Sequence, residues 1–281
     1  MTSYPFQTID VFGEGAFAGN PLAVITTPHD LDLATMQRVT RWLNLSETTF
    51  LLPPTDPAAD YRVRIFTLDR ELPFAGHPTL GTCHAWLTAG GVPRAGDMVM
   101  QQCGAGLVRV RRDGSSLAFA APPLIRSGPV DDEKLREVAA ILNIAVTDIV
   151  DAAWVDNGPG WVAVLLASAE AALAVEPARH HPARVEIGVV GFHPAGSAVA
   201  YEIRSLFSDS YGGLVEDPVT GSLNASVAQW LLGTGRVTAP YIVSQGTRLS
   251  RRGRIRVDQD AEGQIWIGGN TATQFSGTAE I

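Results

Sequence analysis

The order of apolar and polar residues divides the chain into short strands and a few helices. Residues 61–67 alternate between apolar and polar side chains, as a half-buried strand does, and residues 48–52 form a β-branched and apolar run that ends before two prolines. Further strands are predicted at 9–12, 21–25, 188–192 and 198–204, with a hairpin turn at 157–160. Helices are predicted at 31–43, 79–89, 131–142 and 223–232. The pattern predicts a strand-rich, mixed α/β chain.

The two halves of the chain repeat the same landmarks in the same order. In the first half these are Tyr-Arg-Val-Arg at 61–64, Gly-His at 76–77, Trp-Leu at 86–87 and Gly-Leu-Val-Arg-Val at 106–110. In the second half they are Tyr-Glu-Ile-Arg at 201–204, Gly-Ser at 221–222, Trp-Leu at 230–231 and Gly-Arg-Ile-Arg-Val at 253–257. The offsets lie between 140 and 147 residues. This regularity predicts a duplicated fold, and chance similarity of strand and helix patterns is the alternative.

The duplication predicts two lobes. The N-terminal lobe covers 1–120 and the C-terminal lobe covers 121–281, and the final strand could pack back on the N-terminal lobe. The boundary falls at a proline-containing segment, 120–124, where the first copy ends.

Composition excludes several kinds of partner. The net charge is −8, and the basic residues cluster only at Arg248 and 251–254, which argues against binding to nucleic acid. The chain has no apolar run of the roughly 18 residues that would suggest a membrane span. Its start lacks the charged and apolar regions of a secretory signal, so we expect a cytoplasmic protein.

Two predicted helices begin beside glycine. Gly76-His77 and Gly221-Ser222 occupy matched places in the two halves, and Asp217 lies shortly before the second. The N–H groups and dipole at a helix start favour an anion, and glycine lets a ligand approach the backbone. Two such starts could hold a carboxylate and stabilise an enolate-like charge. The alternative is that the glycines only cap helices in a tight core.

Glu47 is a further candidate for a chemical role, and the two cysteines are not. Glu47 lies between a predicted helix and a strand, among apolar and hydroxylic residues, where partial burial would suit a general base. The alternative is a solvated turn or capping glutamate. Cys83 and Cys103 lack the spacing of a disulfide framework or a metal site, so we expect both to be structural.

Three segments of the chain together resemble the PhzF-like (phenazine biosynthesis) family. They are Ser-Glu-Thr-Thr-Phe at 46–50, Pro-Phe-Ala-Gly-His-Pro-Thr at 73–79 and Glu-Asp-Pro-Val-Thr-Gly-Ser at 216–222, of which the last is the most specific. The resemblance covers essentially the whole chain. It implies an α+β fold of the diaminopimelate epimerase type, also seen in proline racemase. In that fold two pseudo-symmetric lobes each wrap a curved, mostly antiparallel sheet around a central helix, with the active site in the cleft between them.

The resemblance also implies an activity. The characterised reaction of the family isomerises a dihydro-hydroxyanthranilate by a proton shift, without metal or organic cofactor. Carried over to this chain, Glu47 would be the catalytic acid/base, and His77 and Asp217 would orient or polarise the substrate. Gly76, Gly221 and Ser222 would hold an anionic group of a small carboxylate-bearing metabolite. The family further implies a homodimer.

Related racemases place one cysteine at each helix start, and this chain is predicted to have Ala75 and Pro218 there instead. A single-base shuttle through Glu47 therefore fits the residues better than a two-thiol mechanism. Two alternatives stay open: a non-catalytic ligand-binding or regulatory protein on the same scaffold, and a racemase that uses carboxylate and histidine. The sequence leaves the substrate and its pathway undetermined.

Overall fold

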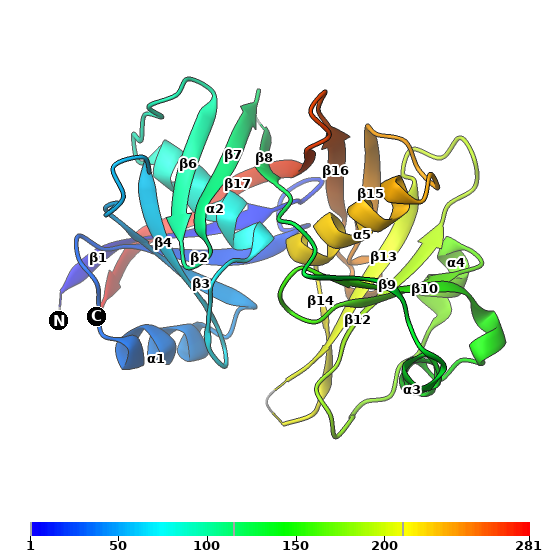
Figure 1. The fold of residues 1–281 in the computed structure, drawn as a ribbon. Coiled ribbons are helices and arrows are strands. Elements are labelled where there is room, and N and C mark those ends of the chain that lie inside the picture. Colours follow the sequence, from blue (N-terminus) through cyan, green and yellow to red (C-terminus); the bar gives the residue numbers. More distant parts are fainter. Residues whose placement is uncertain (1, 115, 210) are drawn as a thin grey trace. The chain divides into compact units, whose positions relative to one another are not determined.

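The computed structural model describes residues 2–114, 116–209 and 211–281, which form two compact units (Figure 1). The N-terminal unit comprises Met1–Ala120 and Gly268–Ile281, and the C-terminal unit comprises Ala121–Ile267. The strand β17 (Ile265–Glu280) therefore gives its first three residues to the C-terminal unit and the rest to the N-terminal unit.

The N-terminal unit is a closed sheet. In order around it the strands are β1 (Ser3–Val11), β2 (Asn20–Thr26), β3 (Glu47–Leu52), β4 (Tyr61–Thr67), β6 (Met98–Cys103), β7 (Gly106–Asp113), β8 (Ser116–Ala120) and β17. Strand β17 pairs with both β8 and β1 and so closes the barrel. The pairs β2–β3 and β4–β6 are parallel, and the short β5 (Glu71–Leu72) adds to β4.

Helix α2 (Gly76–Thr88) occupies the interior of this barrel and contacts β1, β2, β3, β4, β6, β7 and β8 (Figure 1). Its sequence is rich in small and apolar residues on all sides, which is the composition of a helix buried all round. Helix α1 (Leu33–Leu43) packs against β3 and β4, where Met36 joins Phe50 and Phe66 in a buried cluster. Asp32 caps α1 by accepting a hydrogen bond from the Thr35 N–H.

The C-terminal unit repeats this topology. Its strands are β9 (Arg126–Pro129), β10 (Ile149–Asp156), β11 (Val162–Leu166), β12 (Glu186–Phe192), β13 (Tyr201–Ser208), β14 (Leu214–Asp217), β15 (Tyr241–Gln245) and β16 (Gly253–Gln259). The parallel pairs β11–β12 and β13–β15 correspond to β2–β3 and β4–β6. The antiparallel pairs β10–β11, β12–β13 and β15–β16 correspond to β1–β2, β3–β4 and β6–β7.

Helix α5 (Gly221–Gly233) is the counterpart of α2. Each helix has 13 residues. Each follows a short antiparallel strand: β5, which pairs with β4, precedes α2, and β14, which pairs with β13, precedes α5. Eight residues of α5 are buried, and its Leu223 packs against Gly188 of β12. The predicted fold of two pseudo-symmetric lobes, each a curved sheet around a central helix, is confirmed.

Two further helices cover the outside of the C-terminal sheet. Helices α3 (Asp132–Leu142) and α4 (Ala169–Ala174) contribute Leu142 and Ala172 to a second core with Val164 and Val189. Short 3₁₀ turns occur at Val146–Asp148 and Thr247–Leu249. Within the described residues, no helix combines the length and hydropathy needed to cross a membrane.

The predicted helices at 31–43, 79–89, 131–142 and 223–232 correspond to α1, α2, α3 and α5. The predicted hairpin turn at 157–160 connects the antiparallel strands β10 and β11. One detail was wrong: α2 and α5 begin at Gly76 and Gly221, so these glycines are the first residues of the helices rather than the residues before them. Helix α4 was not predicted, because six residues are too few for a periodic pattern.

Candidate active site

Glu47 and His77 meet in the N-terminal unit. Glu47 is the first residue of β3, where pairing with Leu22 on one side and Thr67 on the other fixes its backbone. His77 is the second residue of α2. The Glu47 Oε2 and His77 Nε2 atoms are 3.6 Å apart, and 16% of the Glu47 side chain is exposed against 3% of the His77 side chain. The structure thus brings together two of the predicted site residues.

Burial determines the charge of His77. Removing the imidazole from water disfavours its charged form and lowers the pKa of His77 to about 3, so the ring is neutral near pH 7. Its Nδ1 lies 3.4 Å from the Asn20 Nδ2. An amide nitrogen can only donate, so Nδ1 accepts and the ring hydrogen is on Nε2, which faces the carboxylate of Glu47. His77 is therefore arranged as a hydrogen-bond donor rather than as a base.

Neither central helix is capped at its start by a side chain of the preceding residue. The residues before the two helix starts are Ala75 and Thr220, and neither side chain accepts a hydrogen bond from its own helix. The N–H groups of the first turn have no carbonyl partner within the helix, and the helix dipole is positive there. Both starts, at Gly76 and Gly221, thus have the local features of an anion-binding terminus.

Asp217 and Ser222 belong to a second cluster, in the C-terminal unit. Asp217 is the last residue of β14, is 8% exposed, and accepts a 2.6 Å hydrogen bond from the Thr220 hydroxyl at Oδ2. The Trp161 indole donates to the Ser222 Oγ at 3.2 Å, and the Asn157 amide donates to the Ser222 carbonyl at 2.9 Å. Because Trp161 occupies an acceptor position of the serine hydroxyl, the hydroxyl hydrogen points elsewhere and can serve a ligand.

The two cysteines are remote from this chemistry. Cys83 is fully buried within α2, and burial raises the pKa of its thiol to about 12. Cys103 ends β6, and burial also raises its pKa. Neither thiol would supply a thiolate near neutral pH, as expected for structural cysteines.

By their place before the two central helices, Ala75 pairs with Thr220. Ala75 immediately precedes the first residue of α2, and the residue in the same place before α5 is Thr220, two positions after Pro218. Neither Ala75 nor Thr220 carries a thiol, and the placement of Ala75 and Pro218 where related racemases have cysteines stays a prediction.

Three residues of these clusters had no predicted role: Asn20, Trp161 and Gln245. Nothing in the spacing of Asn20 and Gln245 along the chain indicated a partner for their amides. Contacts between residues 57 and 61 positions apart, as in Asn20–His77 and Trp161–Ser222, become visible only in the fold.

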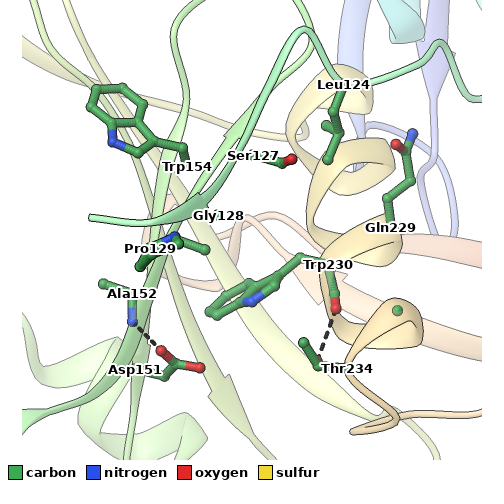
Figure 2. A pocket seen from close by; sticks show the side chains of 12 residues that line it. Leu124, Ser127, Gly128, Pro129, Asp151, Ala152, Trp154, Gln229, Trp230 and Thr234 are labelled. Carbon is green, nitrogen blue, oxygen red and sulfur yellow. Dashed lines mark hydrogen bonds between the residues drawn. The ribbon is translucent and has the colours of Figure 1, made fainter. Parts of the chain in front are cut away.

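A separate cavity of about 470 Å³ lies in the C-terminal unit and contains none of the predicted site residues (Figure 2). It is lined by parts of β9 and β10 and by the C-terminal end of α5, where the Trp230 ring is directed towards Pro129 and Ala152. Among the described residues, no group of three or more histidine, cysteine, aspartate or glutamate side chains is placed to hold a metal ion.

Comparison with known proteins identifies the family. The chain belongs to the PhzC-PhzF family of phenazine biosynthesis-like proteins, whose model matches residues 9–279. A protein named Antisense-enhancing sequence 1 from Schizosaccharomyces pombe is 33% identical over 304 residues, covering 100% of both chains. The trans-2,3-dihydro-3-hydroxyanthranilate isomerase of Pseudomonas aeruginosa is 31% identical over 287 residues, covering 98% of this chain and 99% of its own length.

A solved structure agrees with this assignment. A PhzF family phenazine biosynthesis protein from Enterococcus faecalis superposes with a TM-score of 0.79 at 25% identity and covers 100% of both chains. The predicted resemblance is confirmed, and the chain is an enzyme of the isomerase class.

Proposed function

We propose that the protein is a cofactor-independent isomerase that moves a proton between two carbon atoms of a small carboxylate-bearing substrate. Glu47 is the acid/base in this proposal. The observation that supports it is the approach of the Glu47 carboxylate to within 3.6 Å of the buried, neutral imidazole of His77. A carboxylate beside a neutral N–H donor can accept a proton, hold it, and return it.

The proposed reaction conserves protons. The Glu47 carboxylate removes a hydrogen from one carbon, and the electron pair of the broken C–H bond shifts through the adjacent unsaturated system. The protonated Glu47, whose side chain is 16% exposed and can exchange its proton with water, then delivers a proton to a second carbon, which restores the carboxylate. The Nε2–H of His77 stabilises the negative charge on Glu47 electrostatically before transfer, and it donates a hydrogen bond to the negative charge on the substrate after transfer.

The cluster around Asp217 supplies binding groups in this proposal. The Ser222 hydroxyl and the helix starts at Gly76 and Gly221 donate hydrogen bonds to an anionic group of the substrate. Asp217 accepts from a donor of the substrate, such as a hydroxyl or an amine.

The test is hydrogen exchange with solvent. The first compound to try is trans-2,3-dihydro-3-hydroxyanthranilate, the substrate in the name of the Pseudomonas aeruginosa relative. In D₂O the wild-type protein should introduce deuterium at carbon, and Glu47→Gln should bind the compound without exchange. Glu71→Gln is a matched control, because the Glu71 carboxylate lies in the same unit and is paired with Arg64 rather than with His77. Undiminished exchange by Glu47→Gln would refute the role of Glu47.

A wild-type protein that binds the compound but exchanges none of its carbon-bound hydrogens would favour the non-catalytic alternative. The proposal also includes a cytoplasmic homodimer, as the family resemblance implies. Light scattering would test the dimer, since one chain has a mass of 29.9 kDa.

A further inference from the structure

Gln245 is a buried amide at the centre of the Asp217 cluster. It is the last residue of β15 and has no exposed surface. Its Oε1 accepts hydrogen bonds from the Thr220 N–H at 3.1 Å and from the Asn224 side-chain amide at 2.7 Å. Its Nε2 donates to the Asp217 carbonyl at 3.2 Å and to the Thr220 Oγ1 at 3.1 Å. Two lone pairs and two hydrogens are all that a glutamine amide offers, so its capacity is fully used.

These bonds fix the direction of the amide. The Thr220 backbone N–H can only donate and the Asp217 carbonyl can only accept, so the oxygen and nitrogen of Gln245 cannot exchange places. The Thr220 hydroxyl oxygen therefore accepts from Gln245, and its own hydrogen is directed to the Asp217 Oδ2 at 2.6 Å. Gln245 thereby determines which way the Thr220 hydroxyl points.

The backbone around Gln245 encloses the same segment. A Cβ on Gly246 would lie 2.7 Å from the Pro218 carbonyl oxygen, at a φ of 92° that other residues rarely adopt. A Cβ on Gly253 would lie 2.5 Å from a methyl group of Val219. Both glycines thus allow the end of β15 and the start of β16 to pack directly on residues 217–220, which leaves that segment little room to move.

In the N-terminal unit, a cysteine takes the place of Gln245. The pairing of β4 with β6 and of β13 with β15 begins at Tyr61 and Tyr201, so the residue equivalent to Gln245 is Cys103. Its thiol lies 3.6 Å from the carbonyl of Gly106, within its own hairpin. The buried amide at this place is therefore particular to the unit that contains Asp217.

We propose that Gln245 is a positioning residue of the Asp217 cluster: it holds the Thr220 hydroxyl as a donor to the Asp217 carboxylate and fixes the segment that leads into α5. As far as catalysis is concerned, the inference rests on the proposed role of Asp217 in substrate binding.

The decisive variant is Gln245→Glu, which keeps the shape of the side chain and its acceptor oxygen but replaces the donor nitrogen by a second oxygen. The Thr220 hydroxyl then turns to donate to the new carboxylate, and Asp217 loses this one hydrogen bond from Thr220. Thr220→Val removes the same donor without adding a charge. Carbon-13 NMR of the Asp217 carboxyl group should show its titration midpoint rising by about one pH unit in both variants, the usual effect of losing one hydrogen bond to an ionised group.

Two further variants distinguish positioning from general loss of stability. Thr220→Ser restores a hydroxyl and should return the Asp217 titration towards the wild-type curve. Gln101→Glu makes the same change at an equally buried glutamine of the N-terminal unit, which contacts Tyr61 and Thr79, and should leave the Asp217 titration unchanged.

Enzyme assays complete the test. With the dihydro-hydroxyanthranilate as substrate, Gln245→Glu should raise KM about tenfold with little change in kcat, and its activity should recover at low pH, where protonation of the new carboxyl restores a donor. An Asp217 titration that is the same in wild type, Thr220→Val and Gln245→Glu overturns the inference about Gln245. A shifted titration with unchanged KM instead overturns the role of Asp217 in the proposed function, so the two failures are distinguishable.

Discussion

The two units share one topology but differ in the residues beside their central helices. In the N-terminal unit, α2 begins with Ala75-Gly76-His77, and the neighbouring groups are a buried neutral imidazole and the Glu47 carboxylate. In the C-terminal unit, α5 begins with Thr220-Gly221-Ser222, and the neighbouring groups are hydroxyls, the amide of Gln245 and the Asp217 carboxylate. The duplicated scaffold keeps the helix starts and their N–H groups, while each copy carries its own side chains.

This difference separates two tasks. Proton transfer requires a group that changes protonation, and the N-terminal unit places the Glu47 carboxylate beside the buried, neutral imidazole of His77. Recognition requires groups with fixed hydrogen directions, and the C-terminal cluster has one in the Thr220 hydroxyl. Four predictions test this separation.

The largest effect should come from Glu47→Gln. Loss of a general acid/base reduces rates by about 10²–10⁴-fold, and we expect the exchange of carbon-bound hydrogen to fall within this range or below detection. The amide keeps the size of the side chain, so binding of the compound, measured by calorimetry, should persist. Loss of binding together with exchange would show that Glu47 acts in recognition and would remove the contrast between the units.

His77 should make stability depend on pH. Its folded-state pKa of about 3 lies below the value of about 6.5 in the unfolded chain, so below pH 6.5 the unfolded state binds a proton that the native state does not. This contribution to the free energy of unfolding is present above pH 6.5 and falls by up to about 1.4 kcal/mol per pH unit between pH 6.5 and 3. Denaturant titrations of wild type and His77→Gln at pH 7 and 5 measure it, and the exposed His180 provides the control substitution His180→Gln. Equal pH dependence in wild type and His77→Gln would contradict a neutral, buried ring.

Ser222→Ala should weaken binding with little effect on the chemical step. Loss of one hydroxyl donor to an anion corresponds to about a tenfold rise in KM, and kcat should change less because Glu47 is untouched. Steady-state kinetics separate the two parameters. A drop in kcat with unchanged KM would mean that the C-terminal cluster takes part in proton transfer.

Cys83→Ala should have the smallest effect on activity. The thiol is fully buried with a pKa of about 12, so its removal leaves a small cavity and lowers the melting temperature without changing kcat/KM appreciably. Calorimetry and the exchange assay measure the two quantities. Inactivation would restore a thiol mechanism that the positions of Ala75 and Thr220 argue against.

The fold could be predicted from the sequence more completely than the contacts of the candidate site. Repeated landmarks predicted the duplication because matched strands and helices have matched apolar patterns, as Tyr61–Thr67 and Tyr201–Ser208 illustrate. The pairing of Ala75 with Thr220 before the two central helices was not predicted, because a motif does not mark the first helical residue. The contacts of Gln245 were unpredictable for another reason: they join residues 21 to 28 positions apart across a parallel strand crossover.

The sixteen residues of β17 have a consequence for the order in which the molecule forms during synthesis. The N-terminal unit leaves the ribosome first, yet β1 and β8 have no common partner until residues 268–280 follow. The whole of Ala121–Ile267 is therefore made while the first barrel still has two open strand edges, which are the features of a nascent chain most exposed to wrong pairing. Vectorial synthesis thus favours completion of the second-made unit, with the barrel that contains Glu47 and His77 sealed afterwards.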